Sequence, residues 1–283
     1  MSKKPIQGEL LASVESRYGN NLVVQDNRLI AASQSMTLGE KRLLMMAASQ
    51  LDSRNPMPES NTIKIAAHDF AVLFGLQGGS AYTHIAKAAE MLYHRSIKSI
   101  VKTGEGKSST VEREVRWVWM CEYSKEDSSV VLGFSPYLSP YLTELNRQFT
   151  KYRLSAVAKL GTFYSIRIYE CCVQYLHLGS REVPLEEFRS WLDLGDKYPT
   201  FKDFKKWVLQ PSVTEINEST DVVLDVEPVK RGRSVVALLI TVQEKSKRGW
   251  AAESDDTMQG PKEAVPAAKK RAPRKPKTAP ADA

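Results

Sequence analysis

Cysteine is scarce in this sequence. The 283 residues contain three cysteines, and two of them, Cys171 and Cys172, are adjacent, while Cys121 stands alone. None occurs in a Cys-x-x-Cys or Cys/His spacing, which excludes both a recognisable zinc site and a disulfide framework. We therefore expect a reduced, cytoplasmic protein without a structural metal.

Long apolar runs are missing as well. No segment approaches the ~20 apolar residues of a membrane span. The first twenty residues contain two lysines but no apolar core of a secretory signal. The sequence therefore predicts no membrane partner.

Motifs for catalysis are also absent. No GxxxxGK[ST] phosphate loop occurs, and GEGKSST at residues 104–110 lacks its first glycine and falls in an expected strand hairpin. The four histidines are dispersed and form no His-x-His pair or ligand spacing: His68, His84, His94 and His177. A Ser/His/Asp set assembled only in space stays open at this level. We predict no enzyme, no catalytic residues, no cofactor and no metal.

Positive charge is unevenly spread. The chain has 40 Lys and Arg against 33 Asp and Glu, a net charge of +7. Residues 245–283 contain ten basic and five acidic residues, so +5 of the total lies there and only +2 in the rest. This Lys/Ala/Pro-rich end buries too little apolar surface to fold alone and is expected to be a disordered tail. It either adds affinity for phosphates or only keeps the chain soluble.

The order of expected elements repeats. Residues 69–76, DFAVLFGL, align with residues 187–194, EFRSWLDL, 118 positions later. Each follows a short strand and precedes a longer helix and a strand hairpin, the order of a winged helix-turn-helix. In detail, we expect residues 111–124 to form one strand and residues 153–179 one helix.

The predicted fold is therefore α+β, with two tandem winged-helix domains related by an internal pseudo-repeat. The expected boundaries are a flexible N-terminus at 1–20, an N-terminal domain at 21–145, a C-terminal domain at 146–243 and the disordered tail at 244–283.

The segment YPTFKDFKKWVL, residues 198–209, combines aromatics with lysines. At about 100° per residue, Phe201, Phe204 and Val208 fall within an arc of ~60°. The next ~100° is occupied by three cations: Lys202, Lys205 and Lys206. The segment is expected to be the second helix of a helix-turn-helix, which enters the major groove. The direction of Trp207 is left undecided.

A second basic feature supports this interpretation. Lys230, Arg231 and Arg233 form a tight turn where a wing would touch flanking phosphates. Lysines also recognise guanine edges, and Asp203 is able to accept from cytosine. In the first domain the equivalent candidates are Thr83, Lys87 and Arg95, which predicts weaker DNA contact there.

Two other interpretations of the cationic helix stay open. Lysine-rich helix faces are usually only solvated. The aromatic residues Phe201, Phe204 and Trp207 are alternatively platforms on which single-stranded DNA stacks, although their helical spacing favours core packing.

Three stretches together resemble a known family. They are SMTLGEKRLLMMAASQLD (35–52), FTKYRLSAVAKLGTFYSIRIYE (149–170) and YPTFKDFKKWVLQPSVTEINESTD (198–221), the last continuing into VEPVKRGRSVVAL (226–238). On these residues the chain resembles the iteron-binding replication initiators of theta-replicating plasmids, over roughly residues 20 to 242.

The resemblance implies a function and partners. Monomers of such initiators bind direct repeats at a plasmid origin, assist melting, and recruit the host initiator and replicative helicase in the bacterial cytoplasm. Homodimers bind an operator inverted repeat and repress their own gene, which contributes to copy-number control. Lys202, Asp203, Lys205 and Lys206 match the family's recognition-helix positions, and Lys230, Arg231 and Arg233 match its wing. Trp207 stands where the family often has a basic residue. A repressor without initiator activity and a nickase or ATPase are the alternatives.

Overall fold

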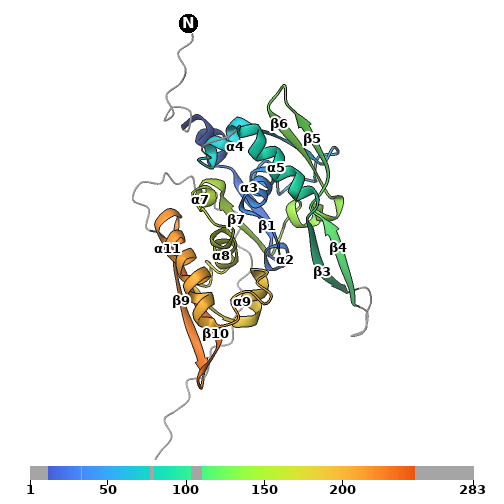
Figure 1. The fold of residues 1–283 in the computed structure, drawn as a ribbon. Coiled ribbons are helices and arrows are strands. Elements are labelled where there is room, and N and C mark those ends of the chain that lie inside the picture. Colours follow the sequence, from blue (N-terminus) through green and yellow to red (C-terminus); the bar gives the residue numbers. More distant parts are fainter. Residues whose placement is uncertain (1–11, 33, 77–79, 103–109, 246–283) are drawn as a thin grey trace, which may run out of the picture. The chain divides into compact units, whose positions relative to one another are not determined.

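The computed structural model describes residues 12–32, 34–76, 80–102 and 110–245 (Figure 1). These residues all belong to one compact unit, Met1–Ser246. The predicted tail lies outside them, apart from its first two residues, as do residues 1–11 of the N-terminus that we expected to be flexible. Among the helices described, none is long and apolar enough to cross a membrane.

The first winged helix is built around helix α3, Leu38–Ala48. Thr37 caps it by accepting a hydrogen bond from the Glu40 backbone N–H, while the Glu40 carboxylate accepts from the Thr37 N–H. This reciprocal capping box satisfies two amide groups that a helix start otherwise leaves unpaired. Residues 40–48 are all buried, so α3 is a central helix. The elements that follow are β2 (Thr62–Ala66), α4 (Ala67–Leu73), α5 (Ala81–Tyr93), β3 (Ser96–Lys102), β4 (Thr110–Arg116), β5 (Val118–Ser124) and β6 (Ser129–Phe134).

The strands of this domain form two sheets. One has the order β2-β6-β5, and the other is the antiparallel pair β3-β4. The prediction of one strand over residues 111–124 is therefore wrong. Trp117 is buried between β4 and β5, and its backbone bonds to Arg95 and Ser135, so the chain changes direction there. In the sequence, the alternation of apolar and polar residues continues through Trp117. It therefore gives no sign that one strand ends at Arg116 and another begins at Val118.

The last part of the described chain, from residue 154 on, starts with two helices in place of the single one predicted over residues 153–179. The first ends before Leu160 and Gly161, and Thr162 caps the second by accepting from the Ser165 N–H at 3.0 Å. Strand order in its sheet is β8-β10-β9. The elements are α7 (Leu154–Ala158), α8 (Phe163–Val173), β8 (Ser180–Pro184), α9 (Leu185–Trp191), α10 (Phe201–Phe204), the π-helical turn η3 (Lys205–Leu209), α11 (Gln210–Ser219), β9 (Val222–Arg231) and β10 (Ser234–Glu244).

The internal pseudo-repeat is confirmed residue for residue. Strand β2 and helix α4 span residues 62–66 and 67–73, and β8 and α9 span 180–184 and 185–191. Both pairs are separated by 118 positions. In each copy a strand leads directly into the first helix of the helix-turn-helix, so the two domains share their local structure.

The segments outside the two motifs connect them. Strand β1 pairs antiparallel with β7 over five residues, from Leu22↔Arg153 to Asp26↔Phe149. This ladder crosses the boundary expected between residues 145 and 146, which stays a prediction. These segments are η1 (Glu15–Gly19), β1 (Leu22–Asp26), α2 (Asn27–Ala31), η2 (Pro136–Leu138), α6 (Ser139–Leu142) and β7 (Phe149–Arg153).

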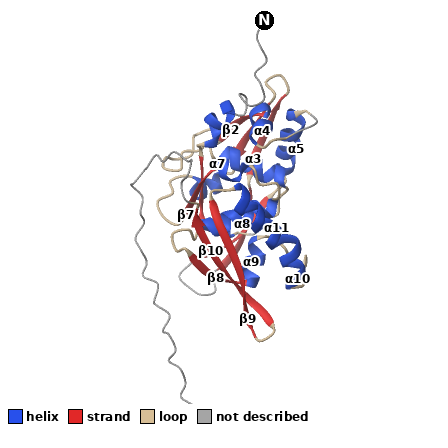
Figure 2. Ribbon diagram, turned by 90° about the vertical axis from the view of Figure 1, so that its left-hand side faces the viewer, coloured by secondary structure: helices blue, strands red, loops and turns tan. Residues whose placement is uncertain are grey.

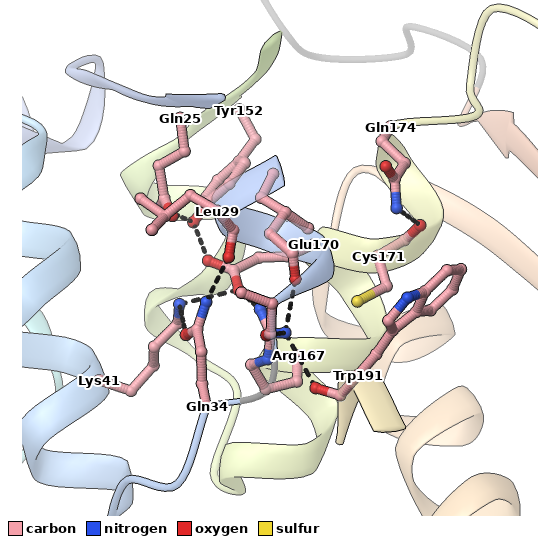
Figure 3. A network of polar contacts seen from close by, with 12 residues as sticks. Gln25, Leu29, Gln34, Lys41, Tyr152, Arg167, Glu170, Cys171, Gln174 and Trp191 are labelled. Atoms are coloured by element: carbon pink, nitrogen blue, oxygen red, sulfur yellow. Dashed lines mark hydrogen bonds and ion pairs between the residues drawn. The ribbon is translucent and has the colours of Figure 1, made fainter. Parts of the chain in front are cut away.

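A buried group of charges lies where these segments meet (Figure 3). The Glu170 carboxylate on α8 contacts Lys41 Nζ on α3 at 2.8 Å and Arg167 Nη1 at 2.9 Å, and all three side chains are fully buried. Tyr152 on β7 donates to Glu170 at 2.5 Å. Arg167 Nη2 donates to three carbonyls, those of Ile30, Ala32 and Trp191. One carboxylate therefore holds two cations and links α3, α8 and β7, while Arg167 reaches the end of α9.

Candidate nucleic-acid interface

The lysine-rich segment of the second domain is one helical stretch made of α10, η3 and α11. It begins at Thr200, whose side chain accepts from the Asp203 N–H at 3.1 Å and donates to Asp203 Oδ2 at 2.7 Å. The cap fixes where the helix starts. The hydrogen bond that Thr200 donates gives the Asp203 carboxylate a partner within the chain. The contact of Asp203 with a cytosine stays a prediction, and it would use the acceptor positions that the carboxylate has left.

The middle of this stretch is a π-helical turn, Lys205–Leu209, in which the Gln210 N–H bonds to the Lys205 carbonyl. Pro211 follows directly. A proline inside a helix has no N–H for the carbonyl four residues earlier, and its ring clashes with that carbonyl. The i→i+5 turn opens the helix at this point, which lets the chain continue through Pro211.

The wider turn changes which side chains face the core. Phe204, Val208 and Leu209 are all buried, although Leu209 would point about 100° away from Val208 on a regular α-helix. Phe201 packs against the core while half-buried. Core packing of Phe204 and Val208 is thus confirmed, and Phe204 is no stacking platform. Trp207, whose direction the sequence left undecided, is 59% exposed.

Three cations surround this exposed face. Lys202, Lys205 and Lys206 are all exposed. Lys206 Nζ lies 4.5 Å from the centroid of the Trp207 ring, within the range of a cation–π contact. The helix therefore presents ammonium groups and one large aromatic ring to solvent on the side opposite its core contacts.

An arginine on α9 holds the turn before this helix. Arg189 Nη1 donates to the Tyr198 carbonyl at 2.9 Å, and Nη2 donates to the carbonyls of Lys197 at 2.8 Å and Gly195 at 3.1 Å. Its guanidinium also lies 5.7 Å from the Phe204 ring. Tyr198 has a φ of +53° and Gly195 a φ of +50°. Positive φ is unfavourable for a tyrosine, so the clamp stabilises a turn that sequence analysis did not single out.

We expect Arg189→Lys to loosen this turn. The planar guanidinium of Arg189 donates hydrogen bonds to three carbonyls at once, and a lysine ammonium cannot reproduce this geometry. The free energy of unfolding should fall by about 1–2 kcal/mol, and DNA affinity should fall as the second helix loses its fixed position. Thermal unfolding and gel-shift titration measure the two effects. The control is Arg147→Lys at an exposed site; equal behaviour of the two variants would contradict the clamp.

The predicted wing is present. The hairpin β9–β10 has a two-residue turn in which Gly232 has a φ of +65°. Glycine at this position suits the tight turns that match strand twist. Lys230, Arg231 and Arg233 are exposed around it. Figure 2 shows the tip of this hairpin and α10 toward the same end of the second domain.

The candidates in the first domain differ in their surroundings. Thr83 and Lys87 are exposed on α5. Arg95 lies beyond the end of that helix, and its guanidinium pairs with the buried Glu40 carboxylate at 2.9 Å. The contact of Arg95 with DNA stays a prediction, and in the structure its guanidinium already pairs with Glu40. The 55 positions between Glu40 and Arg95 follow no local pattern, so the sequence does not indicate this pair.

Metal ligands and thiols show no reactive arrangement in the described part of the chain. No group of three His, Cys, Asp or Glu side chains is placed there to hold a metal ion. All three cysteines are free thiols. Burial raises the pKa of Cys171 to about 11 and that of Cys172 well above its usual value. Thiols with a raised pKa are poor nucleophiles, so the adjacent pair is structural.

Two regions of the chain match models of known protein families. A model described as "Initiator Replication protein, WH1" matches residues 22–173, and one described as "Initiator Rep protein, WH2" matches residues 184–242. This chain belongs to the initiator replication protein family. A replication initiation protein of Escherichia coli is 28% identical over 229 residues, which cover 78% of this chain and 69% of that protein. The PI protein of Escherichia coli is 23% identical over 223 residues, 69% of this chain and 73% of that protein.

The fold of this initiator is shared with a solved structure. The Pi initiator protein, crystallised in complex with iteron DNA, superposes with a TM-score of 0.68 over 81% of this chain and 99% of that chain, at 21% identity. The predicted architecture of two winged-helix domains and the resemblance to replication initiators are therefore confirmed.

Proposed function

We propose that this initiator binds direct repeats at a plasmid origin as a monomer, mainly through its second domain. Lys202, Asp203, Lys205 and Lys206 would lie in the major groove of double-stranded DNA. Lys230, Arg231 and Arg233 would contact flanking phosphates. Thr83, Lys87 and Arg95 of the first domain would supply weaker contacts. The complex of the Pi initiator with iteron DNA supports this choice of ligand.

One observation carries the proposal. The second helix of the C-terminal helix-turn-helix exposes three lysines, and the wing exposes three more cations toward the same end of the domain (Figure 2). A winged helix contacts DNA at these two places. The described residues as a whole are close to neutral, since most of the net charge lies after residue 244. Local clustering therefore provides the cationic surface.

Further steps belong to the same proposal. Bound monomers would assist melting of an AT-rich stretch and recruit the host initiator and replicative helicase. Homodimers, formed largely through the first domain, would bind an operator inverted repeat and repress the gene, which limits copy number. These steps would place the protein in the bacterial cytoplasm on plasmid DNA.

The test uses the DNA beside the gene. We expect tandem repeats of about two helical turns there, and gel-shift titration with the full chain should show tight binding to them and much weaker binding to a scrambled duplex. Affinity should fall with salt concentration, because bound lysines release counterions. A plasmid carrying the repeats should stop replicating when the gene is deleted. Specific binding with undisturbed replication would leave only a repressor, and equal binding to both duplexes would contradict the proposal.

A further inference from the structure

Trp207 is an unusual residue for a solvent-exposed position. Its side chain is 59% exposed, and among the large hydrophobic residues described only Tyr137, at 66%, is more exposed. A tryptophan that contributes to the core would be buried, as Trp191 and Trp117 are. Trp207 instead points away from the buried Val208 and Leu209 because the π-helical turn rotates these neighbours inward.

A cation lies over the indole. Lys206 Nζ lies 4.5 Å from the ring centroid. At an exposed site such a contact contributes only a small free energy, which favours this arrangement of the two side chains. The ring therefore stands beside the ammonium group of Lys206, on the helix expected to enter the groove.

The chemistry of the major groove determines what such a ring is able to contact. Purine and cytosine edges there offer hydrogen-bond donors and acceptors, whereas thymine alone adds an apolar C5-methyl group. An exposed aromatic ring gains free energy by removing apolar surface from water. Among groove groups, the thymine methyl is the one that an indole face matches.

We infer that Trp207 is a specificity-determining residue that packs against the C5-methyl group of a thymine in the repeat. This contact presupposes the duplex binding proposed above and adds a base preference at one position. The basic residue that the family often has here would favour a guanine or a phosphate instead. Trp207 would thus shift the preferred base toward thymine, and Lys206 would keep the indole oriented.

Deoxyuridine gives a direct test, because it lacks only the methyl group of thymidine. Each thymine of one repeat is replaced singly, and the affinity of the full chain is measured by titration. Loss of one buried methyl group, worth about 0.8 kcal/mol, corresponds to roughly a fourfold weaker affinity. We expect this loss at one or two thymines for the unaltered chain and no loss at the same positions for Trp207→Ala.

Two more variants control for indirect effects. Trp207→Phe keeps an aromatic face and should retain the sensitivity to deoxyuridine. Tyr137→Ala removes an even more exposed aromatic residue elsewhere and should leave the whole profile unchanged. Circular dichroism checks that each variant is folded.

The possible results separate this contact from repeat binding itself. Specific binding with an identical deoxyuridine profile for the unaltered chain and Trp207→Ala would overturn the thymine contact and leave the proposed function standing. A flat profile for the unaltered chain would overturn it too. Failure of the unaltered chain to distinguish the repeat from a scrambled duplex would contradict both.

Discussion

Replacing Lys205 and Lys206 together by alanine is expected to reduce repeat binding by about 100-fold or more while the protein stays folded. Both side chains are exposed, and neither ammonium pairs with a carboxylate among the described residues. Their removal should therefore change the free energy of unfolding by no more than about 0.5 kcal/mol. Their predicted partners are base edges and phosphates of the bound DNA.

Salt dependence identifies what the two lysines contact. Each phosphate contact contributes about 0.9 to the slope of log affinity against log salt. If both lysines contact phosphates, the slope should decrease by about 1.8. If they contact base edges, the slope should change little while discrimination against a scrambled duplex is lost. Gel-shift titration at several salt concentrations distinguishes the two.

The matched control removes the same charge elsewhere. Lys151 on β7 and Lys159 after α7 are also exposed. Lys151→Ala with Lys159→Ala should weaken binding only slightly, through the long-range field. Equal losses in the two double variants would mean that net charge rather than the helix face determines affinity, and undiminished binding without Lys205 and Lys206 would refute the recognition-helix assignment.

Glu170→Gln is expected to destabilise the protein more than any other change at the buried charge group. Glu170 is the carboxylate that Lys41 and Arg167 share at 2.8 and 2.9 Å (Figure 3). A neutral amide would leave two buried cations without a counter-charge. Breaking such a pair costs about 3–5 kcal/mol. This is a large part of the free energy of unfolding of a typical domain, which is about 5–15 kcal/mol.

Lys41→Met provides the control at the same site. It removes one of the two cations and leaves Glu170 paired with Arg167 and hydrogen-bonded to Tyr152. We therefore expect a smaller loss, about 1 kcal/mol. Urea unfolding measures both free energies. A loss in Lys41→Met that equals or exceeds that of Glu170→Gln would show that the carboxylate is not the centre of the group.

The same carboxylate predicts a dependence on pH. Burial by itself raises the pKa of Glu170, but Lys41 and Arg167 outweigh it and hold that pKa below the ordinary value of 4.5. A carboxyl with a lowered pKa in the folded state contributes stability that is complete above the unfolded value and is lost as the pH falls through the folded value. The free energy of unfolding of the unaltered chain should therefore decrease as the pH is lowered below about 4.5. The contribution of Glu170 to this decrease should be missing in Glu170→Gln.

The sequence by itself determined the fold and the position of the main candidate site. The 118-residue offset between DFAVLFGL and EFRSWLDL predicted two winged helices, because local order of strands and helices follows apolar periodicity. The cationic helix at residues 198–209 and the basic turn at residues 230–233 are likewise local signals within a few residues. The family resemblance added an expected function, and the matches to both domain models confirmed the family.

Only the tertiary structure decided features that depend on contacts distant in the sequence. The clamp by Arg189 and the pairing of Arg95 with Glu40 bring together groups whose spacing shows no pattern. The group around Glu170 joins residues up to 137 positions apart. The direction of Trp207 depends on a wider helical turn before Pro211, and a wheel drawn with a regular period cannot represent it. Packing of Val208 and Leu209 into one core is the physical reason why the indole faces solvent.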